Sequence, residues 1–139
     1  VDLVRTVRDL ERWLDDAIGG AQCLRVEAPD ERITVAGRAD QIELVVMGLV
    51  VYAADRAIGT EVSLQVIKGD PCHLVLDAHA SALPADSLAP LLDPANADDT
   101  LTATTLAAFR DVVQGLGGEW VPEARGSEAF RLTLKIPSV

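Results

Sequence analysis

Three segments with a helical spacing of apolar residues alternate with short strand-like segments, and this order constrains the fold most. Apolar residues recur every three or four positions over 3–18, 40–57 and 106–116, which predicts three amphipathic helices. The strands that we expect lie at 22–28, 33–35, 61–67, 73–78, 119–124 and 129–136. Helices separated by antiparallel hairpins favour an α+β fold: a two-layer α/β sandwich with a mixed, mostly antiparallel sheet and helices on one face.

Length and charge narrow the classes of function. A chain of 139 residues fits one domain over 1–139, and its start at Val1 suggests the C-terminal part of a longer chain. The formal net charge of −10 argues against nucleic acid and anionic membrane, which are bound through Lys and Arg. No apolar stretch approaches the roughly 18 residues of a membrane span. We therefore expect a cytoplasmic domain without direct membrane contact.

Residues 40–57, DQIELVVMGLVVYAADRA, resemble the nucleotide-site helix of bacterial histidine kinases, which reads roughly D-Q-L-x-x-V-L-x-N-L-x-x-N-A-x-D-A. Gly48 stands at the first asparagine position and Tyr52 at the second, whose side-chain oxygen ligates the magnesium of Mg-ATP in that family. The resemblance implies a retained scaffold with the metal-binding asparagines lost. The residues that fit the pattern are Asp40, Gln41, Ile42, Val45, Val46, Leu49, Ala53 and Asp55.

The resemblance extends over nearly the whole chain. VDLVRTVRDLERWL at 1–14 looks like the segment that follows the dimerisation helices of sensor kinases. FRDVVQGLGGEWVPEARGSEAFRLTLKIP at 109–137 resembles the family's closing helix and hairpin. The implied fold is the histidine-kinase ATP-binding (Bergerat-like) fold shared with gyrase B, Hsp90 and MutL. Packing motifs of this kind support a fold more than an activity.

The family's first glycine box, D-x-G-x-G, is altered in this chain. Asp77 matches the aspartate that accepts a hydrogen bond from the adenine amino group in the family. His79 and Ser81 replace the two glycines that let the backbone approach the nucleotide. His73 and His79 also lack the following acidic residue that marks the family's phosphorylated histidine, so we do not expect either to accept phosphate.

The second glycine box and the segment before it also depart from the family. Residues 101–106, LTATTL, contain no glycine, and we expect Thr102, Thr104 and Thr105 to cap the third helix instead. Residues 93–99 carry three Asp and no Lys or Arg, so they would repel a triphosphate. No zinc motif and no Ser-His-Asp pattern is present.

The resemblance implies a non-catalytic signalling domain of a bacterial two-component system or phosphorelay, similar to the degenerate domain of histidine phosphotransferases. Such a domain would dock a response-regulator receiver domain or a partner kinase, with no catalytic residue, metal or cofactor. Any dimerisation would come from helices upstream. One alternative is a divergent active kinase domain, with ATP and Mg²⁺ as cofactors and Asp77 against adenine. A second alternative is an anti-sigma-factor-like switch, which shares the fold.

Overall fold

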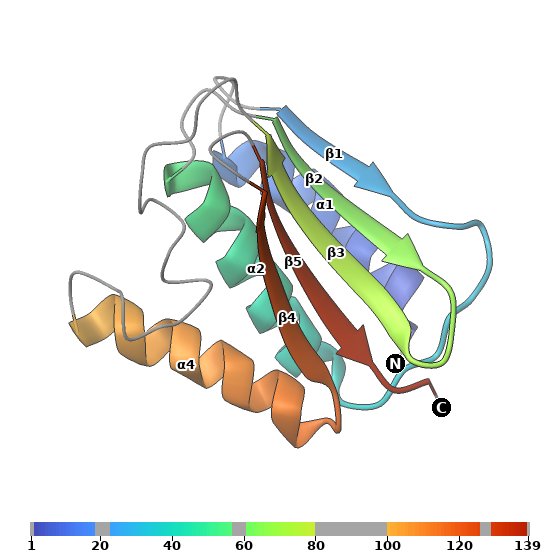
Figure 1. Ribbon diagram of the computed structural model, residues 1–139. Helices are drawn as coiled ribbons and strands as arrows, with labels where there is room; N and C mark the ends of the chain where they lie inside the picture. Colours follow the sequence, from blue (N-terminus) through green and yellow to red (C-terminus); the bar gives the residue numbers. More distant parts are fainter. Residues whose placement is uncertain (1, 19–22, 57–60, 80–99, 126–128, 139) are drawn as a thin grey trace.

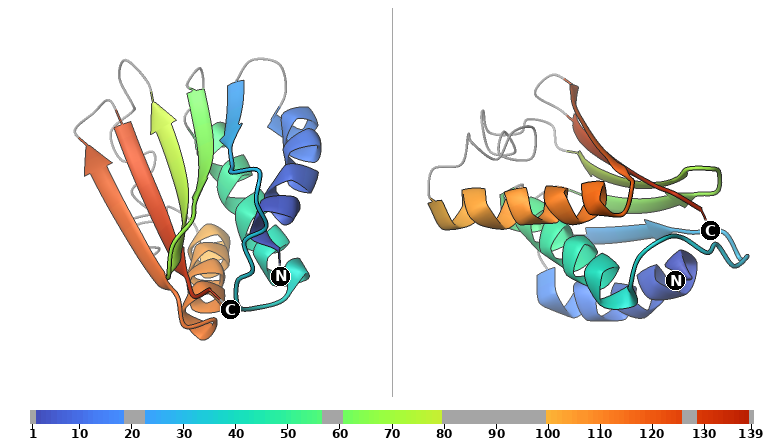
Figure 2. Two further views of the ribbon diagram at one scale, coloured as in Figure 1. Left: turned by 90° about the vertical axis from the view of Figure 1, so that its right-hand side faces the viewer. Right: turned by 90° about the horizontal axis from the view of Figure 1, so that it is seen from below.

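The computed structural model describes residues 2–18, 23–56, 61–79, 100–125 and 129–138. Its described helices lie together on one face of a five-stranded sheet, and no described helix covers the other face, which we call the open face (Figures 1 and 2). This arrangement confirms the predicted two-layer α+β sandwich. The elements in chain order are α1 (Leu3–Ile18), β1 (Cys23–Glu27), α2 (Ala39–Arg56), β2 (Glu61–Ile67), β3 (Cys72–His79), α4 (Thr100–Gly115), β4 (Glu119–Arg125) and β5 (Ala129–Ile136).

The sheet is mixed, as expected, with the strand order β1-β2-β3-β5-β4. Only the β1–β2 pair is parallel among these strands; the β2–β3, β3–β5 and β4–β5 pairs are antiparallel. The parallel pair follows from the chain path, because α2 crosses between β1 and β2 and parallel strands need such a crossover. Each of the two antiparallel hairpins, β2–β3 and β4–β5, coincides with a hairpin expected from the alternation of apolar residues.

Two expected local structures are wrong. Residues 33–35 form no strand, because Thr34 bridges to Asp2 while Val35 bridges to Ser138, and neither pairing continues into a ladder. Helix α4 begins at Thr100, so the three threonines expected to cap it lie within its first two turns.

Two helix ends are closed by hydrogen bonds of the residues that flank the helices. Oδ1 of Asp2 accepts a hydrogen bond from the Arg5 backbone N–H at 3.2 Å, so Asp2 caps the start of α1. Beyond α4, Gly117 has a φ of +82°, which side chains rarely allow. The N–H of Gly118 donates to the carbonyl of Val113 and that of Gly117 to Gln114, both at 3.0 Å, which is the Schellman pattern.

The core lies between the helices and the sheet, and the alternation of β3 decides which of its residues enter it. Leu74, Leu76 and Ala78 are buried within this core, whereas Val75 and Asp77 are buried outside it and face the open side of the sheet. No described helix is long and apolar enough to cross a membrane. The largest fully buried side chains among the described residues are Leu3, Val7, Leu14, Val35, Val46, Val50, Val62, Cys72, Leu106 and Leu132.

Candidate functional site

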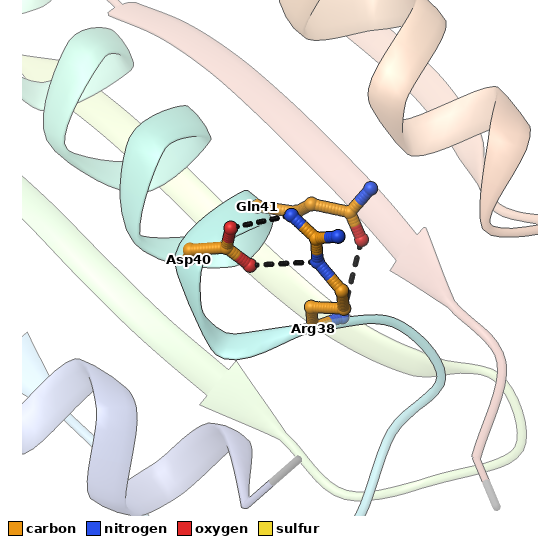
Figure 3. Close-up of polar contacts among 3 residues, drawn as sticks. All are labelled: Arg38, Asp40 and Gln41. Atoms are coloured by element: carbon orange, nitrogen blue, oxygen red, sulfur yellow. Dashed lines mark hydrogen bonds and ion pairs between the residues drawn. The ribbon is translucent and has the colours of Figure 1, made fainter.

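The start of α2 is held by three side chains that Figure 3 shows together. Arg38 donates two hydrogen bonds to Asp40, from Nη2 to Oδ2 at 2.6 Å and from Nε to Oδ1 at 3.0 Å. Oε1 of Gln41 accepts a hydrogen bond from the Arg38 backbone N–H at 3.1 Å, which is half of a capping box. The hydrogen bond from Arg38 lowers the pKa of Asp40. The motif residues Asp40 and Gln41 therefore stabilise the helix itself.

Helix α4 packs against α2 at the first asparagine position. A Cβ atom at Gly48 would lie 2.5 Å from Cε2 of Phe109 and closer still to Cζ. Phe109 is buried and belongs to the core. Real Cβ atoms do not approach carbon this closely, so the space into which an asparagine at position 48 would project is filled by the aromatic ring.

Tyr52 lies one helical turn after Gly48 and therefore on the same face of α2. It packs against the core, and its hydroxyl oxygen is buried. Both asparagine positions of the family thus contribute to packing in this chain, one through the absence of a side chain and one through an aromatic ring. Asp55, which also fits the family pattern, is in the last turn of α2, and its side chain lies outside the described residues.

Asp77 faces away from α2. It pairs in register with Ser63 on β2 and Arg131 on β5. Its Oδ1 accepts a hydrogen bond of 2.7 Å from Nε of Arg131, with 9% of the Asp77 side chain exposed. This bond also raises the pKa of Arg131.

The structure therefore does not bring Asp77 together with Gly48 and Tyr52. A nucleotide held against α2 would lie on the helix side of the sheet, where Ala78 projects. The adenine contact of Asp77 stays a prediction, and this geometry gives it no support. The sequence of β3 could have shown this orientation. Successive side chains of a strand point to opposite faces of the sheet, so Asp77 faces away from the core to which Leu74 and Leu76 point.

Phe109 and Arg131 are the two residues that sequence reasoning missed. Phe109 was assigned to the apolar face of its helix, but nothing in a single sequence indicates that it meets Gly48. The partner of Asp77 depends on the register between β3 and β5, which the sequence does not specify to the residue. Both contacts join residues more than fifty positions apart.

The remaining altered boxes are only partly described. His79 ends β3, and its side chain and Ser81 lie outside the described residues, as do residues 93–99. Residues 101–106 belong to α4. Among the described residues, no group of three or more His, Cys, Asp or Glu side chains is arranged to hold a metal ion.

Comparisons with known proteins bear on the fold. No protein-family model matches this chain, and no curated protein matches its sequence. The solved structure of the mycobacterial sensor histidine kinase MprB is 18% identical, with a TM-score of 0.73 over 99% of this chain and 95% of that one. The ATP-binding domain of PrrB from Mycobacterium tuberculosis is 20% identical, with a TM-score of 0.67 over 100% and 96%.

A third structure extends the same likeness to another bacterium. The histidine kinase domain of the blue-light-activated kinase EL346 from Erythrobacter litoralis is 19% identical, with a TM-score of 0.72. The match covers 99% of this chain and 61% of that one. At these identities the likeness is one of fold, and it agrees with the element order and the motifs of the sequence. The chain has the fold of the histidine kinase ATP-binding domain.

Proposed function

We propose that this chain is a non-catalytic, histidine-kinase-like signalling domain of a bacterial two-component system or phosphorelay. Its role would be to dock a response-regulator receiver domain or a partner kinase without binding Mg-ATP in the family's usual way. The observation that carries this proposal is the contact of Phe109 with Gly48. It supports the proposal because α4 occupies the space that an asparagine at position 48 would need.

The chemistry of the altered positions supports the same conclusion. Mg²⁺ prefers oxygen ligands in near-octahedral geometry. Gly48 offers no side-chain oxygen, and Tyr52 replaces an amide with a phenol that packs against the core. Residues 101–106 also lack the glycines whose amides would receive phosphates in the family. A single loss could be compensated elsewhere, whereas these losses concern separate parts of nucleotide binding.

The matching fold favours one other function, a divergent kinase domain that still binds nucleotide and phosphorylates a histidine outside this chain. Calorimetric titration with Mg-ADP and the non-hydrolysable ATP analogue AMPPNP separates the two. A ligand that binds only the native state must also raise its melting temperature. We expect no heat of binding and no thermal shift for this chain at millimolar nucleotide. A histidine kinase domain with both asparagines, titrated under the same conditions as a positive control, should bind. Micromolar binding by this chain would overturn the proposal.

The docking role needs its own measurement. Receiver domains from the same organism would each be titrated into the isotope-labelled chain. Binding would be followed by the amide chemical shifts of this chain. We expect at least one receiver domain to give saturable shifts confined to one surface. Failure of every receiver domain and every partner kinase domain to bind would remove this half of the proposal, whatever the result with nucleotide.

A further inference from the structure

The open face of the sheet has a groove over β1, β2 and β3. Its volume is about 270 Å³, which is below the roughly 300–1,000 Å³ typical of small-molecule sites. A groove of this size suits one long side chain better than a cofactor. The residues that line it are Arg25, Glu27, Glu61, Ser63, Leu64, Gln65 and Asp77.

We propose that this groove is a docking site for an arginine side chain presented by a partner protein. The inference rests on the docking role proposed above and names the surface and the chemistry of the contact. It concerns the face opposite to the helices, so it is separate from the altered nucleotide positions on α2. Charge complementarity and the geometry of the acceptors both favour an arginine as the occupant of the groove.

Carboxylates exceed cations in the groove. Three carboxylates line it, and Arg131 neutralises one of them, Asp77, from the neighbouring strand. The other two share a single cation: Arg25 Nε lies 3.9 Å from Glu27, and its Nη1 lies 3.7 Å from Glu61. Among the described side chains, three carboxylates against two arginines leave one negative charge in excess. The net charge of −10 adds a long-range attraction for a basic partner.

The present ion pairs around Arg25 leave its carboxylate partners available. The Arg25 side chain is 65% exposed, and both of its contacts are long, so these pairs contribute little. Their geometry nevertheless shows that one guanidinium can reach Glu27 and Glu61 together. A guanidinium presents five donors in a planar fork, and the groove is also lined by Ser63 and Gln65, residues whose side chains carry oxygen acceptors. An arginine therefore matches these acceptors better than the compact ammonium of lysine.

The chain offers a matched pair of variants. Glu61 and Glu119 both lie on the open face, and each is 3.7 Å from a cationic partner, Arg25 and Lys135 respectively. Glu61 lines the groove, whereas Glu119 is on β4 at the far edge of the sheet. Glu61→Gln and Glu119→Gln therefore remove the same charge from the same face, and only the first removes it from the groove.

The test uses the peptide acetyl-Gly-Gly-Arg-Gly-Gly-amide and the isotope-labelled 139-residue chain. We expect saturable amide shifts centred on Arg25, Ser63, Gln65 and Asp77. Glu61→Gln should weaken binding about two- to fivefold, as expected for one exposed ion pair, while Glu119→Gln leaves it unchanged. The same peptide with Lys in place of Arg should bind more weakly. Thermal denaturation of both variants checks that each remains folded.

Several results would overturn the proposal. Equal weakening by both substitutions would show non-specific attraction to an acidic surface. L-Arginine amide that binds as tightly as the peptide would show a site for a small free cation, and absence of saturable shifts would show no site. A dimer in sedimentation in which a second copy of the chain occupies the groove would also reject it. None of these outcomes depends on nucleotide, so the failure of this inference and of the nucleotide proposal are distinguishable.

Discussion

At the scale of single residues, the contact of Gly48 with Phe109 can be tested by adding one methyl group. Gly48→Ala requires the aromatic ring to move, and overpacking of this kind costs about 1–3 kcal/mol. The gain in helix propensity, about 1 kcal/mol, offsets part of this cost. We expect urea unfolding to show a net loss of stability, and a smaller loss when Phe109→Ala is already present.

Gly115 provides the control for this prediction. It lies near the end of α4, and a Cβ atom there would meet nothing within 4 Å. Gly115→Ala should therefore be neutral or slightly stabilising. If both alanine variants changed the free energy of unfolding equally, the close packing of α4 against α2 would be disproved.

The ion pair of Asp77 and Arg131 gives a second residue-scale prediction. Asp77→Asn removes a charge-assisted hydrogen bond of 2.7 Å from a nearly buried carboxylate. Such bonds contribute about 1.5–3 kcal/mol, and because 35% of Arg131 is exposed to water, we expect the lower end of this range. Glu119→Gln, at an exposed pair, should cost no more than about 1 kcal/mol. Urea midpoints that rank the two variants in the reverse order would contradict this assignment.

At the scale of elements, the start of α2 gives a pH dependence. Arg38 lowers the pKa of Asp40 in the folded state. A carboxylate with a lowered folded pKa stabilises the fold above its unfolded pKa of about 3.9, and this contribution is lost as the pH falls through the folded value. We expect Asp40→Asn to lower the urea midpoint at pH 7 and to match the wild type at the acid end.

Arg38→Gln is the companion variant because it removes the other half of the same pair. It should reproduce the loss at pH 7, and the double variant should show no further loss. A difference between wild type and Asp40→Asn that stayed constant from pH 7 to the lowest pH at which both fold would show that the pair with Arg38 does not set this pKa.

The elements and the two hairpins could largely be predicted from sequence, whereas the contacts between residues far apart in the chain could not. Apolar spacing placed all three described helices and both hairpins, because helical and strand periods differ clearly. The strand predicted around Thr34 is wrong. Apolar residues do alternate there, but the residues with which the segment forms bridges are single residues far away in the sequence. Asp77 was matched to the family motif by its place in the sequence, but the side of the sheet that it faces depends on the alternation of side chains along β3. The sequence was enough to identify Gly48 and Tyr52 as replacements for the family's asparagines. The position of the Phe109 ring against Gly48 could be found only from the structure.

At the scale of the whole molecule, the two faces of the sheet have different roles. On the helix face, the described parts of α2 and α4 pack against each other and against the strands, and Gly48 and Tyr52, at the asparagine positions of the family, take part in this packing. The open face carries charged and polar side chains and the groove over β1 and β2. A domain in which Phe109 fills the space beside Gly48 can still recognise a partner through its open face, which is why we place the proposed docking there.

The same architecture predicts an order of local stability. Among the described strands, β3 lies in the middle of the sheet, bonded to β2 on one side and β5 on the other, whereas β1 is a five-residue edge strand bonded to β2 alone. Amide hydrogens exchange most slowly where opening requires global unfolding. We expect native-state hydrogen exchange by NMR to give the strongest protection in β3 and the weakest strand protection in β1.

Strand β4 serves as the internal comparison for this prediction. It is also an edge strand, but it has seven residues and an antiparallel partner, so its protection should fall between those of β1 and β3. Protection of β1 equal to that of β3 would contradict the prediction and would mean that the outer edge of β1 is covered in solution. Weak protection of β1 would leave the strand that carries Arg25 and Glu27 able to adjust when a partner side chain enters the groove.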